Sequence, residues 1–149
     1  MYIYIIEAAS SFLDCRITKP GCVNVGFRNL INPLGVYPHN KTNFVKEKLE
    51  TLGIPFEYTS TIKAALHNPN LIVHTVGAIM SIPRIEKTDG DYCMYHEVFT
   101  PSIWNILEKL DGEKMNILEK LGFERLPYVE AYKNRNSPDD KRDAKEVFF

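Results

Sequence analysis

The sequence predicts an α/β fold that becomes mainly α-helical, with the change near residue 60. Before that point, short β-prone runs alternate with turns, and after it apolar residues recur at helical spacing behind helix-capping residues. The chain has 149 residues, of which 44% are hydrophobic and 25% charged. This is an ordinary globular mixture, long enough for one domain or for one domain and part of another. We therefore divide the chain into residues 1–60 and 61–149.

The first part is predicted to contain short strands and one helix. Residues 2–6 form an unbroken β-prone run typical of a buried strand. Residues 13–18 and 23–27 are two further strands on either side of the turn sequence Lys-Pro-Gly-Cys, and residues 34–37 allow one more. Asn40 or Asn43 can cap a helix that runs to Leu52 and stops at Gly53.

The second part is predicted to be helical from Ser60 or Thr61, either of which can cap a short helix through residue 66. A buried helix then begins at Pro69, carries His74, and ends near Pro83. Residues 91–99 are aromatic and irregular, which favours an extended segment. These patterns predict two helices separated by a less regular stretch.

A long helix is predicted from Thr100, with Pro101 at its first position. It contains an internal repeat, because the hexapeptide at 105–110 recurs at 116–121. Eleven residues are close to three helical turns, so both copies show the same face. The repeat therefore predicts a buried stripe, a packing device, made by Ile106, Leu107, Leu110, Ile117, Leu118 and Leu121.

Glycines and the end of the chain complete this assignment. Gly112 is expected to kink or divide the long helix, and Gly122 to stop it. Residues 128–134 predict another helix, and the polar run 134–146 predicts a solvated loop. The final Val-Phe-Phe, exposed after a charged loop, leads us to expect a truncated chain.

Composition also excludes several classes of function. The net charge of -1 gives no electrostatic footprint for nucleic acid or for an anionic membrane, and no apolar run approaches the ~20 residues of a membrane span. Three cysteines without a C-x-x-C pair argue against disulfides and zinc, and no metal site is expected. A reducing cytoplasm is the expected location. No G-x-G-x-x-G or G-x-G-x-x-A turn is present to hold a dinucleotide.

His74 is the most informative single residue, because it interrupts an almost unbroken apolar run. An ionisable side chain in such surroundings must find a partner, stay neutral or take part in chemistry. On these grounds alone, a hydrogen-bonded core histidine and a functional histidine are both open readings.

Several short motifs surround His74. The chain carries Asn68-x-Asn70-x-x-x-His74, then Arg-Ile-Glu at 84–86, Tyr-His-Glu-x-Phe-Thr-Pro-Ser at 95–102, Asp-x-Glu-Lys at 111–114 and Leu-Gly at 121–122. This order of motifs resembles that of the octopine/nopaline (opine) dehydrogenase family. The family pattern runs N-x-N-x-x-x-H-P, G-R-I-E, Y-x-E-G-x-T-P-S-V, D-x-E-R and Leu-Gly. The segment Glu-Ala-Ala-Ser-Ser-Phe-Leu-Asp-Cys-Arg at 7–16 also looks like the family's E-T-x-x-x-P-Y-x-x-R.

This resemblance implies an oxidoreductase that joins an amino acid to a 2-oxo acid such as pyruvate, with NAD or NADP as the cofactor. It also implies the fold in more detail. Residues 1–60 would be the terminal strands of a Rossmann-like nucleotide-binding domain, and residues 61–149 part of the α-helical domain. The partners implied are the two small substrates, with complementary dehydrogenase fragments or self-association as further possibilities.

The resemblance also implies roles for individual residues. His74 matches the catalytic histidine, which polarises the oxo-acid carbonyl and moves a proton. Asn68 and Asn70 either cap the helix or orient substrate, and Arg84 either pairs with Glu86 or binds a substrate carboxylate. Thr100 begins a helix whose N–H groups can also receive a carboxylate.

The departures from the family pattern qualify these expectations. Thr75, Ser81 and Val98 replace a proline, an asparagine and a glycine of the pattern. The nucleotide fingerprint is absent, and so is the later aspartate that the family pairs with its histidine; Asp111 belongs to a different motif. The alternative hypothesis is therefore a non-catalytic truncated remnant or small binding module. The sequence leaves open the amino acid, the oxo acid, the choice of NADH or NADPH and the oligomeric state.

Overall fold

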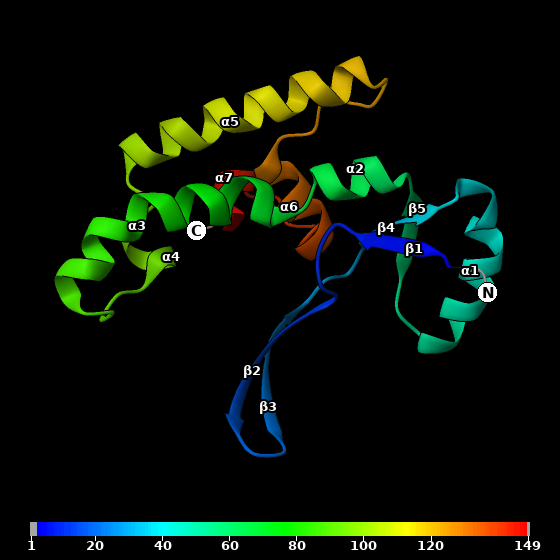
Figure 1. The fold of residues 1–149 in the computed structure, drawn as a ribbon, viewed down its shortest axis with the longest axis horizontal. Coiled ribbons are helices and arrows are strands. Elements are labelled where there is room, and N and C mark those ends of the chain that lie inside the picture. Colours follow the sequence, from blue (N-terminus) through cyan, green and yellow to red (C-terminus); the bar gives the residue numbers. More distant parts are fainter. Residues whose placement is uncertain (1–2, 149) are drawn as a thin grey trace. The chain divides into compact units, whose positions relative to one another are not determined.

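The computed structural model describes residues 3–148, and their arrangement confirms a few strands followed by a mainly helical region (Figure 1). In chain order the elements are β1 (Ile5–Ala8), β2 (Leu13–Lys19), β3 (Cys22–Arg28), β4 (Asn32–Tyr37), η1 (His39–Lys41), α1 (Thr42–Leu49), η2 (Glu50–Leu52), β5 (Phe56–Thr59), α2 (Thr61–Leu66), η3 (Asn70–His74), α3 (Thr75–Thr88), α4 (Met94–Glu97), α5 (Pro101–Lys120), α6 (Tyr128–Asn136) and α7 (Ala144–Phe148). Met1, Tyr2 and Phe149, on which parts of two sequence expectations fall, lie outside the described residues.

These elements belong to two compact units. The first comprises the residues up to Asn68 together with those from Val129 onward, and the second comprises Pro69–Tyr128. Each unit is described by itself.

A three-stranded sheet of order β1-β4-β5 organises the first unit. β4 pairs antiparallel with β1 and parallel with β5, and α1 lies in the connection that a parallel pair requires. Its core contains Leu34, Val36 and Val45, against which other side chains pack: Leu49, Phe56 and Tyr58. β5 is a strand that the sequence reading did not predict.

The first strand corrects the prediction of a buried strand at residues 2–6. β1 begins later, and Ile5 and Ile6 are 56% and 43% exposed. The reason is topological, because β1 pairs only with β4 and lies at the edge of its sheet among the described residues. A β-prone run fixes the backbone conformation, whereas burial depends on the neighbours that the sheet supplies.

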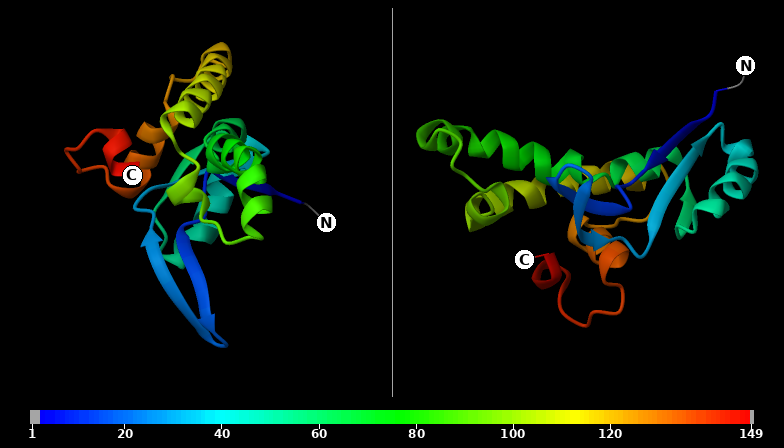
Figure 2. Two further views of the ribbon diagram at one scale, coloured as in Figure 1. Left: turned by 90° about the vertical axis from the view of Figure 1, so that its left-hand side faces the viewer. Right: turned by 90° about the horizontal axis from the view of Figure 1, so that it is seen from below.

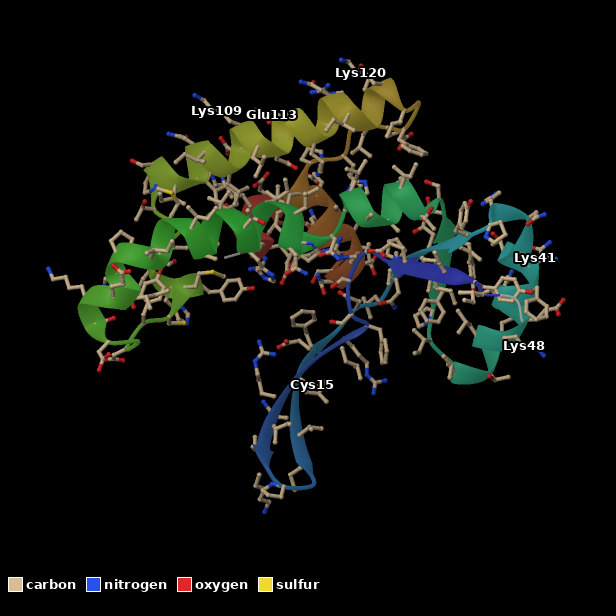
Figure 3. All side chains as sticks on the ribbon, viewed as in Figure 1. Cys15, Lys41, Lys48, Lys109, Glu113 and Lys120 are labelled. Carbon is tan, nitrogen blue, oxygen red and sulfur yellow. The ribbon has the colours of Figure 1, made fainter. Side chains whose placement is uncertain are left out.

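β2 and β3 form the two strands predicted on either side of the 19–22 turn. They pair antiparallel around Gly21, whose φ of 75° suits the left-handed region. Figures 1 and 2 show them as a two-stranded ribbon, and every residue of β3 is exposed. Cys15, labelled in Figure 3, lies on β2.

In the first unit, one predicted helix cap is confirmed and the other is wrong. Ser60 caps α2, because its hydroxyl oxygen accepts the Lys63 N–H at 3.0 Å. α1 is preceded by η1, so Lys41 takes the N-cap position without a side-chain bond, and the predicted Asn40 or Asn43 cap is wrong. The predicted stop at Gly53 is confirmed by its φ of 64°.

The second unit begins with η3, a π-helical turn that continues directly into α3. α3 does not end near Pro83 as predicted but continues to Thr88, where Asp89 closes it with a φ of 50°. Pro83 removes one N–H from the ladder, but Pro83 and Ile79 both lie on the exposed face. Water can reach a carbonyl there, so the proline is tolerated.

The segment predicted to be extended at residues 91–99 contains the short helix α4 instead. The Glu97 carboxylate accepts the Cys93 backbone N–H at 3.2 Å, which satisfies one of the N–H groups that a helix start leaves open. This hydrogen bond between a side chain and the backbone therefore favours a short helix that hydrophobic periodicity does not indicate.

α5 is continuous, so the predicted kink at Gly112 is wrong (Figure 1). Of the predicted stripe, Leu107 and Leu118 are fully buried and Leu110 is half-buried, but the other three side chains are exposed: Ile106, Ile117 and Leu121. Only a narrow face of the helix packs against the core of the unit, and the apolar residues of the repeat extend beyond that face. Figure 3 shows Lys109, Glu113 and Lys120 on the solvent side of the same helix.

The last elements confirm one helix and correct the loop after it. α6 includes the predicted helix at 128–134, and Gly122 ends α5 as predicted, with a φ of 80°. The end of the predicted loop at 134–146 belongs to α7. The Phe148 ring packs edge-on against Tyr132 at 5.2 Å, so this aromatic is not the exposed end that the sequence suggested.

No helix among residues 3–148 is long and apolar enough to cross a bilayer. Within the same residues, no group of three or more His, Cys, Asp or Glu side chains is placed to hold a metal ion.

Candidate functional site

The π-helical turn η3 brings Asn70 and His74 together. The Asn70 side-chain oxygen lies within hydrogen-bond distance of His74 Nδ1, and the Thr75 hydroxyl donates to the Asn70 carbonyl oxygen at 2.6 Å. π turns are rare and frequent at functional sites. Thr75 stands where the family pattern has proline, and its hydroxyl makes a hydrogen bond that a proline side chain cannot make.

A third residue, Tyr95 of α4, completes this cluster. Its hydroxyl lies 2.6 Å from His74 Nε2, and the two rings meet edge-on with centroids 6.1 Å apart. We refer to Asn70, His74 and Tyr95 as the His74 cluster. Sequence reasoning placed Tyr95 in a motif but gave it no role, because 21 residues separate it from His74 and no periodicity links them.

His74 is half-buried, rather than buried in the core as its apolar run suggested. Burial lowers the pKa of His74 below its ordinary value of 6.5, because the charged imidazolium loses hydration. A lowered pKa favours the neutral ring near neutral pH, which is the form that accepts a proton.

Close packing holds α4 against α3. A Cβ built on Gly77 would lie 2.7 Å from the Met94 sulfur, so a larger residue at position 77 would force the Met94 side chain to move. The Tyr92 hydroxyl also lies 2.6 Å from the hydroxyl of Ser81, a fully buried residue of α3. Tyr92 therefore contacts α3, and Tyr95 contacts the turn before it. Met94, which lies between them in the sequence, packs against Gly77.

Arg84 pairs with Glu97 and not with Glu86, the sequence neighbour considered for it. Its Nε donates to the Glu97 carboxylate at 3.0 Å, and the guanidinium is half exposed. The pKa of Glu97 is lowered, first by the Cys93 N–H and then by its hydrogen bond with Arg84. Arg84 thus already holds a carboxylate in this conformation.

The other predicted binding residues are less engaged with the cluster. Thr100 stands at the N-cap of α5, is exposed, and makes no side-chain capping bond. Asn68 is half-buried and lies directly before the helical segment that begins at Pro69, where either of its expected roles, helix cap or substrate contact, remains a prediction. The sequence-predicted residues that the structure brings together are therefore Asn70 and His74.

A buried ion pair lies on α5 of the same unit. Lys114 Nζ is 2.6 Å from the Asp111 carboxylate and donates to the Leu126 carbonyl at 3.0 Å, and the Tyr128 N–H donates to the other Asp111 oxygen at 2.8 Å. The pair fixes the chain after α5 against that helix. Asp111, a motif residue in the sequence, has this structural contact.

The first unit contains a cavity of about 240 Å³. Its walls are formed by β2, β3, β4 and the loop before β5, and its lining residues are Phe12, Leu13, Arg28, Asn29, Asn32, Leu52, Gly53, Ile54 and Pro55. None of the residues predicted from sequence as a site lines this cavity.

Comparison with known proteins agrees with the motif order around the cluster. The family model described as the α-helical domain of NAD/NADP octopine/nopaline dehydrogenases matches residues 57–148, more than half of the chain. The chain belongs to the octopine/nopaline dehydrogenase family. It is also 26% identical, over 132 residues, to an opine dehydrogenase from Arthrobacter sp. (strain 1C), an alignment that covers 85% of this chain.

The same alignment covers 35% of the Arthrobacter protein, so the chain spans about a third of that relative's length. The matched region includes the second unit and both flanking segments, so the His74 cluster lies within the octopine/nopaline dehydrogenase domain.

Proposed function

We propose that this chain is part of an opine dehydrogenase-like oxidoreductase, which joins an amino acid to a 2-oxo acid such as pyruvate and uses NAD(P)H for the reduction. The observation that carries the proposal is the His74 cluster within a matched family domain. Residues 1–60 then form the last portion of a nucleotide-binding domain, and residues 61–149 belong to the helical domain.

His74 supplies proton transfer in this proposal. When the amine nitrogen attacks the oxo-acid carbonyl carbon, a C–N bond forms and the carbonyl π electrons move to oxygen. The amine loses one proton and the oxygen gains one. A second proton, supplied by solvent, lets that oxygen leave as water: the C–O bond breaks and the nitrogen lone pair forms the C=N bond of an iminium ion. A neutral imidazole Nε2 can accept the first proton and return it, which is general acid–base catalysis.

The remaining residues can bind the substrates. We propose that Arg84 binds a substrate carboxylate through its planar guanidinium, in exchange for Glu97, its partner at 3.0 Å. Asn68 and Thr100 are kept as further substrate-binding candidates, whereas Asn70 acts through its contact with the imidazole ring.

The residues of this chain do not fit the nicotinamide cofactor's phosphates. A glycine-rich turn between a strand and a helix is the usual cradle, and none of the eight glycines forms a G-x-G-x-x-G or G-x-G-x-x-A sequence. The residues that bind these phosphates would have to come from another part of the enzyme or from a complementary chain.

The test is oxidation of NADH or NADPH in the presence of pyruvate and a panel of amino acids. The chain is assayed alone and together with a separately expressed opine dehydrogenase nucleotide-binding domain. We expect activity in the mixture, its loss in His74→Ala, and its retention in His96→Ala, which changes an exposed histidine of α4. If the folded wild-type protein is inactive in all of these mixtures, the result would favour the alternative, a non-catalytic remnant or binding module.

A further inference from the structure

We propose that Tyr95 is a positioning residue of His74: its hydroxyl donates to Nε2 and, with Asn70 at Nδ1, fixes the ring in one tautomer with Nε2 as the proton-accepting atom. The role in catalysis rests on the proposed function, whereas the positioning itself is a property of the His74 cluster.

The two ring nitrogens have different partners. The Asn70 side chain presents its oxygen to Nδ1, and an amide oxygen can only accept a hydrogen bond, so Nδ1 carries the proton. Nε2 then has a free lone pair in the neutral ring, and the Tyr95 hydroxyl donates to it at 2.6 Å. The geometry thus defines the protonation of both atoms.

A row of aromatic rings holds Tyr95 in place. The Tyr95 ring lies 6.2 Å from that of Phe99, which in turn lies 6.5 Å from the edge-on ring of Trp104. Trp104 is buried at the start of α5 and donates its indole N–H to Glu108 at 2.6 Å. Tyr95 itself is 51% exposed, so substrate can reach its hydroxyl and take its place at Nε2.

Two ion pairs involve charged groups on the elements next to the His74 cluster. On α5, which contacts η3, the buried charges are Asp111 and Lys114, and these form one ion pair. On α3 and α4, Arg84 pairs with Glu97. Tyr95 is the titratable group in direct contact with the imidazole, and burial is the cause of the lowered pKa of His74.

The substitution Tyr95→Phe tests the proposal, with Tyr92→Phe as the matched control. Both variants remove one hydroxyl from the same segment, but Tyr92 contacts Ser81 and not His74. Because a hydrogen bond to the neutral ring disfavours the charged ring, we expect Tyr95→Phe to raise the pKa of His74 by about one pKa unit. Nitrogen-15 NMR of the histidine rings measures this pKa and the tautomer without substrate or cofactor.

We expect wild type and Tyr92→Phe to show a protonated Nδ1 and an unprotonated Nε2 above the pKa of His74. In Tyr95→Phe the Asn70 oxygen should still hold the proton on Nδ1, so the expected change is the raised pKa of His74. An unchanged pKa in Tyr95→Phe, or the same change in both variants, would overturn the proposal. Replacement of Tyr95 with a ring-fluorinated tyrosine supplies a second test, because a stronger donor should lower the pKa of His74 further while the size of the side chain is kept.

Kinetics separates this proposal from the proposed function. In an active mixture, Tyr95→Phe should shift the acidic limb of the kcat/KM profile upward by the same amount as the NMR pKa, and Tyr92→Phe should leave it in place. If no mixture is active, the proposed function fails while the NMR result still decides the role of Tyr95.

Discussion

Replacement of Lys114 by methionine should be among the most destabilising single changes in the second unit. The Lys114 side chain is 2% exposed and that of Asp111 8%, so the variant leaves a carboxylate buried without its cation. Methionine keeps most of the apolar stem, which limits any cavity, and the Leu126 carbonyl also loses its donor. Breaking such a pair costs about 3–5 kcal/mol, a large share of the ~5–15 kcal/mol stability of a typical domain.

Urea unfolding followed by circular dichroism, with linear extrapolation, measures this loss. Amide hydrogen exchange along α5 is the second readout, because a chain of two compact units need not unfold in one step. Lys120→Met is the matched control, since Lys120 is exposed near the end of the same helix (Figure 3), and it should change stability by no more than about 0.5 kcal/mol.

A double variant tests the reasoning itself. Asp111→Asn removes the charge but keeps an oxygen that can accept the Tyr128 N–H, so Asp111→Asn with Lys114→Met should be more stable than Lys114→Met alone. A loss below about 1 kcal/mol in Lys114→Met would refute the argument. So would a double variant that is less stable than the single one.

Four further substitutions test other parts of the structure. Gly35→Ala should prevent α2 from packing on β4, since the added Cβ would lie 2.3 Å from the Thr61 backbone nitrogen. In Gly112→Ala the added Cβ has no atom within 4 Å, so this variant should stabilise α5 by about 0.5–1 kcal/mol in thermal unfolding. Ser60→Ala should cost about 1 kcal/mol in urea unfolding, because its hydroxyl caps α2. The pKa of His74 is lower in the folded chain than its ordinary 6.5, so the unfolded chain binds more protons below that pH. The free energy of unfolding should therefore fall as the pH drops from 6.5 through the pKa of the folded chain. His74→Ala should remove this part of the pH dependence.

Each of these predictions has a contrary outcome. Gly35→Ala with wild-type stability would contradict the close approach of backbone to backbone. Thr100→Ala is the control for the cap, since Thr100 holds the N-cap of α5 without a side-chain bond, and an equal loss in both variants would contradict the assigned Ser60 bond. A pH dependence of stability that is identical with and without His74 would contradict the lowered pKa.

Much of the local structure is readable from the sequence because it depends on residues close together in the chain. The Lys-Pro-Gly-Cys turn, the Ser60 cap and the stops at Gly53 and Gly122 are each decided within a few residues. The predicted change from strands to helices is confirmed for the same reason, since hydrophobic period is a local property.

Burial was harder to predict, because it depends on what lies opposite. The β-prone run at 2–6 gives no sign that β1 ends up at a sheet edge, and the repeat in α5 gives no sign that only Leu107 and Leu118 meet the core. Pro83 also shows this limit, since the sequence marks a helix end there, whereas α3 continues to Thr88 with Pro83 on its exposed face.

The sequence by itself determined that His74 sits in an apolar run within the motif order of the opine dehydrogenases, and the match of residues 57–148 supports that family. Only the tertiary structure decided what the imidazole contacts. Asn70 lies four residues before His74, a spacing that a helix already brings onto one face, whereas Tyr95 lies 21 residues after it and reaches the imidazole because α4 packs against α3. Contacts between residues far apart in the chain depend on backbone proximity, and the fold alone provides it.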